Sequence, residues 1–165
     1  MTTELFNVNA RRQVLHALQT WGESNGITVK ERTVRAPLLD TEDEAVILRH
    51  GAYRRRKTRG GQYRAAFVFE FHCMSLRGDL RDDKKTDRAA LLASMIEKEF
   101  QYKDLSVYDH AGGQGGTLLG ILQFGHASWR NADQRATIHG DSVEYSMETP
   151  KTEHTIVSYT AFLNC

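Results

Sequence analysis

The chain has 165 residues, of which 40% are hydrophobic and 26% are charged, and its formal net charge is +1. Its two cysteines exclude a small fold held together by disulfides, and no apolar run approaches the roughly 20 residues that a membrane helix needs. We therefore expect one globular domain over residues 1–165, folded in a reducing cytoplasm and without a membrane partner.

The first half of the chain predicts one helix and three strands. Apolar residues recur at helical spacing in residues 9–22, between an asparagine cap and a glycine stop. Alternating apolar and polar residues then predict strands over 27–34 and 44–53. The longest alternation covers residues 62–76, where three phenylalanines and a cysteine share one face, so this segment predicts the clearest strand.

The second half of the chain predicts another helix and three more strands. Residues 88–102 have an apolar stripe at helical spacing. Strands are expected over 105–110, 117–129 and 154–164, with a polar stretch before the last of them. This order predicts an α+β domain, in which a mostly antiparallel sheet is covered on one face by the two amphipathic helices.

Three segments are expected to be mobile loops. Residues 54–61 combine glycines with a run of like charges, and residues 111–116 consist mostly of glycine and offer few side chains. Both features oppose packing. Residues 77–86 form a third, strongly charged connection.

The sequence offers few signs of catalysis or of a cofactor. The glycine loop lacks the Lys-Ser/Thr pair of a phosphate-binding loop, and the seven histidines show no metal-ligand spacing. The neighbours Asp109 and His110 beside this loop leave open a small hydrolase, although adjacent strand residues point to opposite faces. We expect no enzyme activity, no cofactor and no metal.

The main candidate site is a basic run in "AYRRRKTRGGQYRAAF", which predicts the tip of a hairpin turning at two glycines. Its five cations carry +5, so the rest of the chain sums to 1 − 5 = −4. Such a cluster favours an anionic partner, either a protein or a nucleic acid, over a tip that is merely solvated. No aromatic residue interrupts the run, which weighs against a dedicated single-strand binder. The candidate partner-binding residues are Arg54, Arg55, Arg56, Lys57 and Arg59.

The order of elements, with a second helix in "TDRAALLASMIEKEF" and an alternating final strand in "TIVSYTAFLN", resembles the tail terminator, or tail-completion, proteins of long-tailed bacteriophages. The resemblance implies a ring, usually a hexamer, that caps the tail tube, ends its polymerisation and joins it to the capsid neck. It also implies partners in the tube and the neck or connector, and a place in the host cytoplasm during assembly and then in the virion tail. The alternative is a small nucleic-acid-binding protein that uses the basic loop 54–59.

Overall fold

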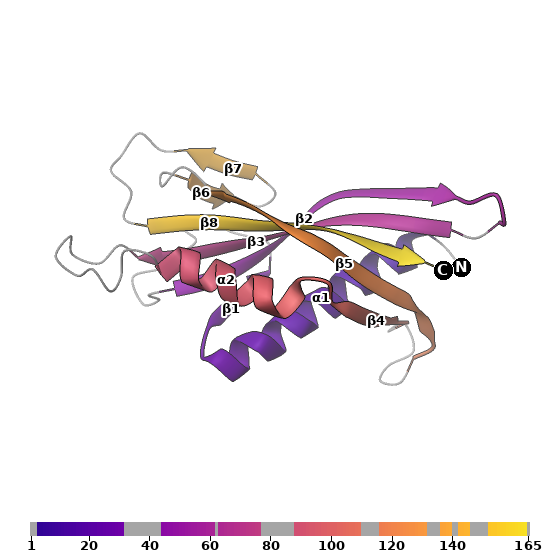
Figure 1. Ribbon diagram of the computed structural model, residues 1–165, viewed down its shortest axis with the longest axis horizontal. Coiled ribbons are helices and arrows are strands. Elements are labelled where there is room, and N and C mark those ends of the chain that lie inside the picture. The colour runs from indigo at the N-terminus through magenta and orange to yellow at the C-terminus, as the bar shows by residue number, and fades with distance from the viewer. Residues whose placement is uncertain are drawn as a thin grey trace.

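The computed structural model describes residues 3–31, 44–61, 63–76, 88–109, 116–131, 136–139, 142–145 and 152–164. Within these ranges the chain forms two helices and eight strands (Figure 1). The helices are α1 (Thr3–Asn25) and α2 (Arg88–Phe100). The strands are β1 (Thr28–Glu31), β2 (Glu44–Lys57), β3 (Tyr63–Leu76), β4 (Asp104–Tyr108), β5 (Leu118–Asn131), β6 (Ala136–His139), β7 (Ser142–Tyr145) and β8 (Thr152–Asn164).

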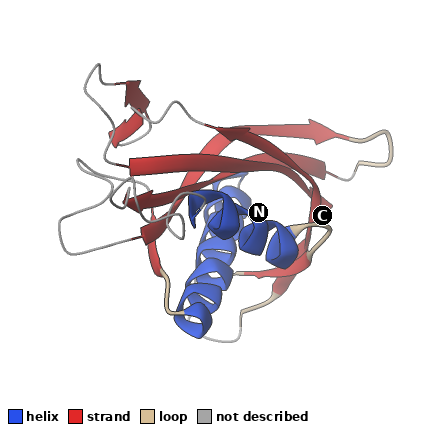
Figure 2. Cartoon of the chain, turned by 60° about the vertical axis from the view of Figure 1, so that its left-hand side comes forward, coloured by secondary structure: helices blue, strands red, loops and turns tan. Residues whose placement is uncertain are grey.

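Six strands form one curled sheet in the order β1-β2-β3-β8-β5-β4, while β6 and β7 pair in a separate hairpin (Figures 1 and 2). The α+β class is confirmed. The sheet is mixed rather than purely antiparallel, because β1 runs parallel to β2. Alternation identifies a strand but not its direction, and residues 32–43 supply the roughly twelve residues that a parallel crossover needs.

The structure differs most from the sequence prediction in three places. Helix α1 begins earlier and ends later than the predicted 9–22. Strand β2 continues to Lys57 because its second half pairs with β3, whereas the prediction ended this strand at residue 53. The β6–β7 hairpin lies in the polar stretch where no element was predicted.

One core cluster joins both helices to alternate residues of the central strands. The ring of Phe71 lies 4.7 Å from that of Phe100 on α2, and Phe69 stacks 5.7 Å from Phe124 on β5. Cys73 belongs to the same cluster, and its burial raises the pKa of its thiol. The face of β3 that carries the three phenylalanines and the cysteine is therefore buried.

Two β-bulges lie on one line across the sheet. On β2, residues 51–52 stand opposite Val68, and on β5, residues 125–126 stand opposite Thr160. Val68 and Thr160 are themselves cross-strand partners in the regular β3–β8 pairing, so the bulges of β2 and β5 lie at the same level of the sheet. Because a bulge bends a strand and increases its twist, this bulge line explains part of the curl of the sheet in Figure 2.

Candidate functional site

The candidate site lies on the outer face of the sheet, which is the face whose side chains alternate with those of the core cluster. Cross-strand register places five arginines on this face of β2, β3 and β5. Glu70 is the single carboxylate among the described side chains on this face of β2, β3, β8 and β5. The arginines are Arg49, Arg54, Arg56, Arg64 and Arg130.

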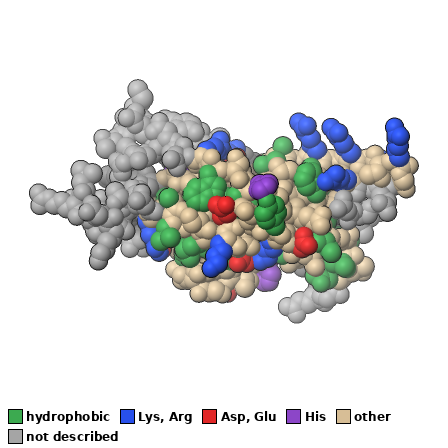
Figure 3. Space-filling model, viewed as in Figure 1, with side chains coloured by type: hydrophobic (Ala, Val, Ile, Leu, Met, Phe, Trp, Pro, Cys, Tyr) green, Lys and Arg blue, Asp and Glu red, His purple; other side chains and the backbone are tan. Residues whose placement is uncertain are grey.

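Beyond the bulge line, towards the β2–β3 turn, the outer face carries an arginine patch, formed by Arg54, Arg56 and Arg64 beside Phe162. All three arginines are exposed, and none has an ion pair within the described part of the chain. The guanidinium of Arg64 lies over the ring of Phe162, with 4.3 Å between its central carbon and the ring centroid. In Figure 3, Lys and Arg side chains stand out at the end of the molecule that carries this turn.

The predicted basic loop is corrected by this arrangement. Arg54 to Lys57 lie in strand β2 and pair with β3, because the turn begins only at Thr58. Gly61 closes the turn with a φ of 79° and donates its backbone N–H to the carbonyl of Thr58 at 3.0 Å. The mobility of this segment stays a prediction.

Strand geometry divides the five predicted cations. Arg54 and Arg56 point to the outer face, whereas Arg55 and Lys57 alternate with them and share the side of Tyr53. Arg59 lies in the turn itself. The structure therefore brings two of the five together and adds Arg64 and Phe162, which sequence reasoning did not include in the site.

On the other side of the bulge line, the outer face carries a paired cluster of Arg49, Glu70, His72, Arg130 and His154. Arg130 donates a hydrogen bond to Oε1 of Glu70 at 3.0 Å, and Arg49 lies 3.5 Å from Oε2 of the same carboxylate. Nε2 of His72 lies 3.3 Å from that oxygen, and Nδ1 of His72 lies 2.8 Å from Nε2 of His154. Four strands are thus connected through one carboxylate and two imidazoles.

The hydrogen-bonding chemistry of the paired cluster indicates which nitrogen atoms of its two histidines carry protons. A carboxylate at neutral pH accepts hydrogen bonds only, so His72 donates from Nε2 to Glu70. Burial lowers the pKa of His72, so at neutral pH its ring carries one proton and Nδ1 accepts. His154 must then donate from Nε2. Its Nδ1 is buried, and no hydrogen-bond partner for it lies among the described residues. Both imidazoles are therefore neutral in this arrangement.

Burial and charge move the pKa values of the cluster in consistent directions. The hydrogen bond from His72 lowers the pKa of Glu70, and its charge interactions with His72, Arg130 and Arg49 act in the same direction. Burial lowers the pKa of His72, against the opposing effect of Glu70. Burial also lowers the pKa of His154, to about 3, and nearby positive charge adds to the effect. Neutral imidazole is the stable form in the folded protein.

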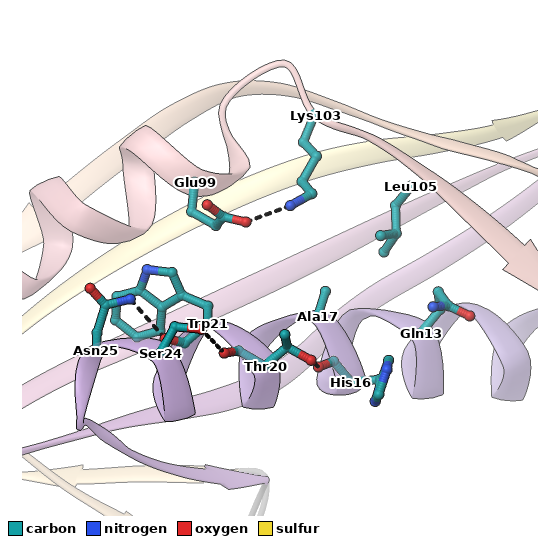
Figure 4. A pocket seen from close by; sticks show the side chains of 10 residues that line it. All are labelled: Gln13, His16, Ala17, Thr20, Trp21, Ser24, Asn25, Glu99, Lys103 and Leu105. Atoms are coloured by element: carbon teal, nitrogen blue, oxygen red, sulfur yellow. Dashed lines mark hydrogen bonds and ion pairs between the residues drawn. The ribbon is translucent and has the colours of Figure 1, made fainter.

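A shallow groove of about 350 Å³ lies between α1 and the connection from α2 to β4 (Figure 4). Its charged pair is already satisfied, because Lys103 bonds to Glu99. Thr20 and Ser24 donate their hydroxyls to carbonyls of their own helix. The groove therefore offers few unsatisfied groups to a ligand, and the outer face is the better candidate.

The glycine loop gives no catalytic arrangement among the described residues. Asp109 donates its backbone N–H to the carbonyl of Thr117 at 2.9 Å, which closes the β4–β5 hairpin. A Cβ at residue 116 would fall 1.5 Å from the carbonyl oxygen of Asp109, so only glycine fits there. His110, the remainder of loop 111–116 and the loop 77–86 lie outside the described residues. The hydrolase hypothesis is therefore not tested.

The described residues contain no group of three or more His, Cys, Asp or Glu that could hold a metal ion. Neither α1 nor α2 combines the length and the hydropathy needed to span a bilayer. Comparisons with protein-family models and with curated proteins gave no match, so a function has to be inferred from the residues themselves.

Proposed function

We propose that the chain is a structural assembly protein that caps a phage tail tube as a ring, ends its polymerisation and joins it to the capsid neck. The single observation that supports docking is the arginine patch, whose cations lack carboxylate partners in the described part of the chain. Like charges repel one another in the isolated subunit, and an acidic surface turns that repulsion into attraction. The resemblance in element order is what supports the other parts of the proposal. These are the tube and the neck as partners, a ring of six copies, and the passage from host cytoplasm to virion tail.

The surfaces of the subunit suit a ring. A ring subunit needs two different surfaces that complement each other. We infer that both helices lie on the core-facing side of the sheet, because residues of both belong to the core cluster. The outer face and the two sheet edges are then left to contact neighbouring subunits. The edges differ in charge, because exposed arginines line the end of β2 and the exposed Asp104 lies on β4. The proposal includes no catalysis and no cofactor.

The test is a charge reversal to glutamate of the four exposed candidate cations, Arg54, Arg56, Lys57 and Arg59, in the phage that carries the gene. We expect a folded subunit, because exposed charges contribute little to stability, together with tails of abnormal length or tails that are not joined to heads. Electron microscopy of lysates measures tail length and attachment. The matched control is the same reversal at Arg12, an exposed arginine on α1. Tails of normal length, joined to capsids, would overturn the proposal.

Nucleic-acid binding remains the competing function for the same cations. It predicts normal tail termination together with lost DNA binding, and a DNA affinity that falls steeply with salt. Salt-dependent DNA binding by the purified chain, abolished in the reversed variant while its tails stay normal, would favour this alternative.

A further inference from the structure

We propose that the arginine patch binds an acidic protein segment that also carries an apolar residue, with Arg64, held against Phe162, as its anchor. The inference deepens the proposed docking function and rests on it for the protein nature of the partner. It names the chemistry of that partner and adds binding residues outside the basic run.

Register places the patch in two adjacent rows across four strands. One row runs from Arg54 through Ala66 and Phe162 to Gln123. The second row is Arg56, Arg64, Asn164 and Ile121. With strands about 4.8 Å apart, each row is about 14 Å wide. Cations therefore occupy β2 and β3, whereas the rows end on β8 and β5 with uncharged side chains.

The uncharged end of the patch offers apolar surface. Ile121 on β5 is 45% exposed. Phe162, Ala66 and Val68 are half-buried on the same face. Protein-binding surfaces combine an apolar part that becomes buried with a polar part that stays accessible to solvent. The partner should therefore place a carboxylate over β3 and an apolar side chain towards β5.

Contact with Phe162 prepares Arg64 for a carboxylate. A guanidinium stacked on an aromatic ring loses rotational freedom before a partner arrives, while its N–H groups remain available at the edge of the plane. These N–H groups match the two oxygens of a carboxylate. Arg54 and Arg56 lie beside it on β2 without a competing carboxylate among the described side chains.

The same contact disfavours a nucleic acid. Single-strand binders stack bases on exposed aromatic faces. Here the guanidinium of Arg64 already lies over one face of the Phe162 ring, and the ring is only half-exposed. A base would have to displace Arg64 before it could stack there. The observations therefore favour an acidic protein segment.

The test titrates the full-length, isotope-labelled chain by NMR with three probes. These are a short glutamate peptide with one central phenylalanine, the all-glutamate peptide, and an oligothymidylate of equal charge. We expect shifts at the arginine patch, with the phenylalanine peptide binding about fivefold more tightly than the all-glutamate peptide. Tighter binding of the oligothymidylate than of either peptide, or shifts located away from the patch, would overturn the inference.

Three variants assign the roles of the anchor. Arg64→Gln should weaken binding of the phenylalanine peptide about tenfold, because it removes a charged hydrogen-bond donor. Phe162→Thr keeps the charge but removes the stacking, and should weaken binding about threefold. Arg64→Lys keeps both fold and charge and should also bind more weakly, because the planar fork is lost. Arg12→Glu is the control and should bind as the wild type does; wild-type affinity in both Arg64 variants would contradict the anchor role.

The two proposals can fail separately. If the four-residue reversal disrupts tails while the phenylalanine peptide causes no shift at the patch, docking stands and this inference is wrong. If that peptide binds at the patch while tails of the reversed variant are normal, the inference stands and the ring function is wrong.

Discussion

On one side of the bulge line, Arg49 and Arg130 both bond to Glu70, whereas Arg54, Arg56 and Arg64 on the other side have no carboxylate partner among the described residues. Both groups lie on the same face of the same sheet, in the same kind of backbone. The residue type therefore does not decide what an arginine does on this face. One carboxylate at the centre of the paired cluster makes its arginines part of the fold, and the lack of one leaves the patch available to a partner.

The largest effect should come from the core that supports both halves. Phe69 is 1% exposed and stacks between Phe67 and Phe124. Phe69→Ala should lower the free energy of unfolding by about 3–5 kcal/mol, because it leaves a cavity beneath the bulge line. Denaturant unfolding measures the loss, and NMR shows whether both halves unfold together. Unfolding of one half alone would show that the paired cluster and the arginine patch belong to independently stable regions.

Removing the central carboxylate should affect only the paired cluster. Glu70→Ala leaves His72, Arg49 and Arg130 without their acceptor and should cost about 2–3 kcal/mol of unfolding free energy. Arg54→Gln also removes one charge from the outer face, but it should leave stability unchanged because no pair is broken. Urea midpoints of the two variants test this contrast, which fails if both lose the same amount.

The paired cluster should make stability depend on pH. The pKa values of His72 and His154 are lowered in the folded state, so the unfolded chain binds more protons below about pH 6.5. This contribution to stability is present above that pH and is lost as the pH decreases, by about 1 kcal/mol between pH 6.5 and 5.5 for His154, and the lowered pKa of His72 acts in the same direction. His154→Leu should remove the part of this slope that His154 contributes. An equal slope in that variant would show that the pair does not carry the effect.

The smallest effect tests the bulge line. A Cβ at residue 51 would lie 2.9 Å from a methyl carbon of Val68, so the side chain of Val68 must shift to admit it. Gly51→Ala should therefore cost about 1 kcal/mol. Amide shifts should change on the arginine side of the line and in β3 near Val68, while those of the paired cluster stay constant. Shifts spread evenly over both halves would indicate that the line does not separate them.

Sequence alone could predict which residues share a face of one strand, but not which strands are neighbours. The alternation of β3 already placed Arg64 and Glu70 on one face, and that of β8 placed Phe162 on the face of Ile156. The contact between Arg64 and Phe162, and the bond between His72 and His154, depend on the pairing of β3 with β8, which are far apart in the chain. The direction of β1 is another non-local feature, since alternation is the same in parallel and antiparallel strands.

The bulge in β2 also determines which face of the sheet each later side chain of that strand points to. Side chains in a strand alternate with a period of two, so one residue more or fewer reverses every later position. Deleting Ala52 while keeping the pairing of β3 would turn Arg54 and Arg56 towards the core side and bring Arg55 and Lys57 to the outer face. The charge composition of the chain would not change at all. The surface that this protein presents to a partner is therefore encoded by the count of residues before the arginines as much as by the arginines themselves.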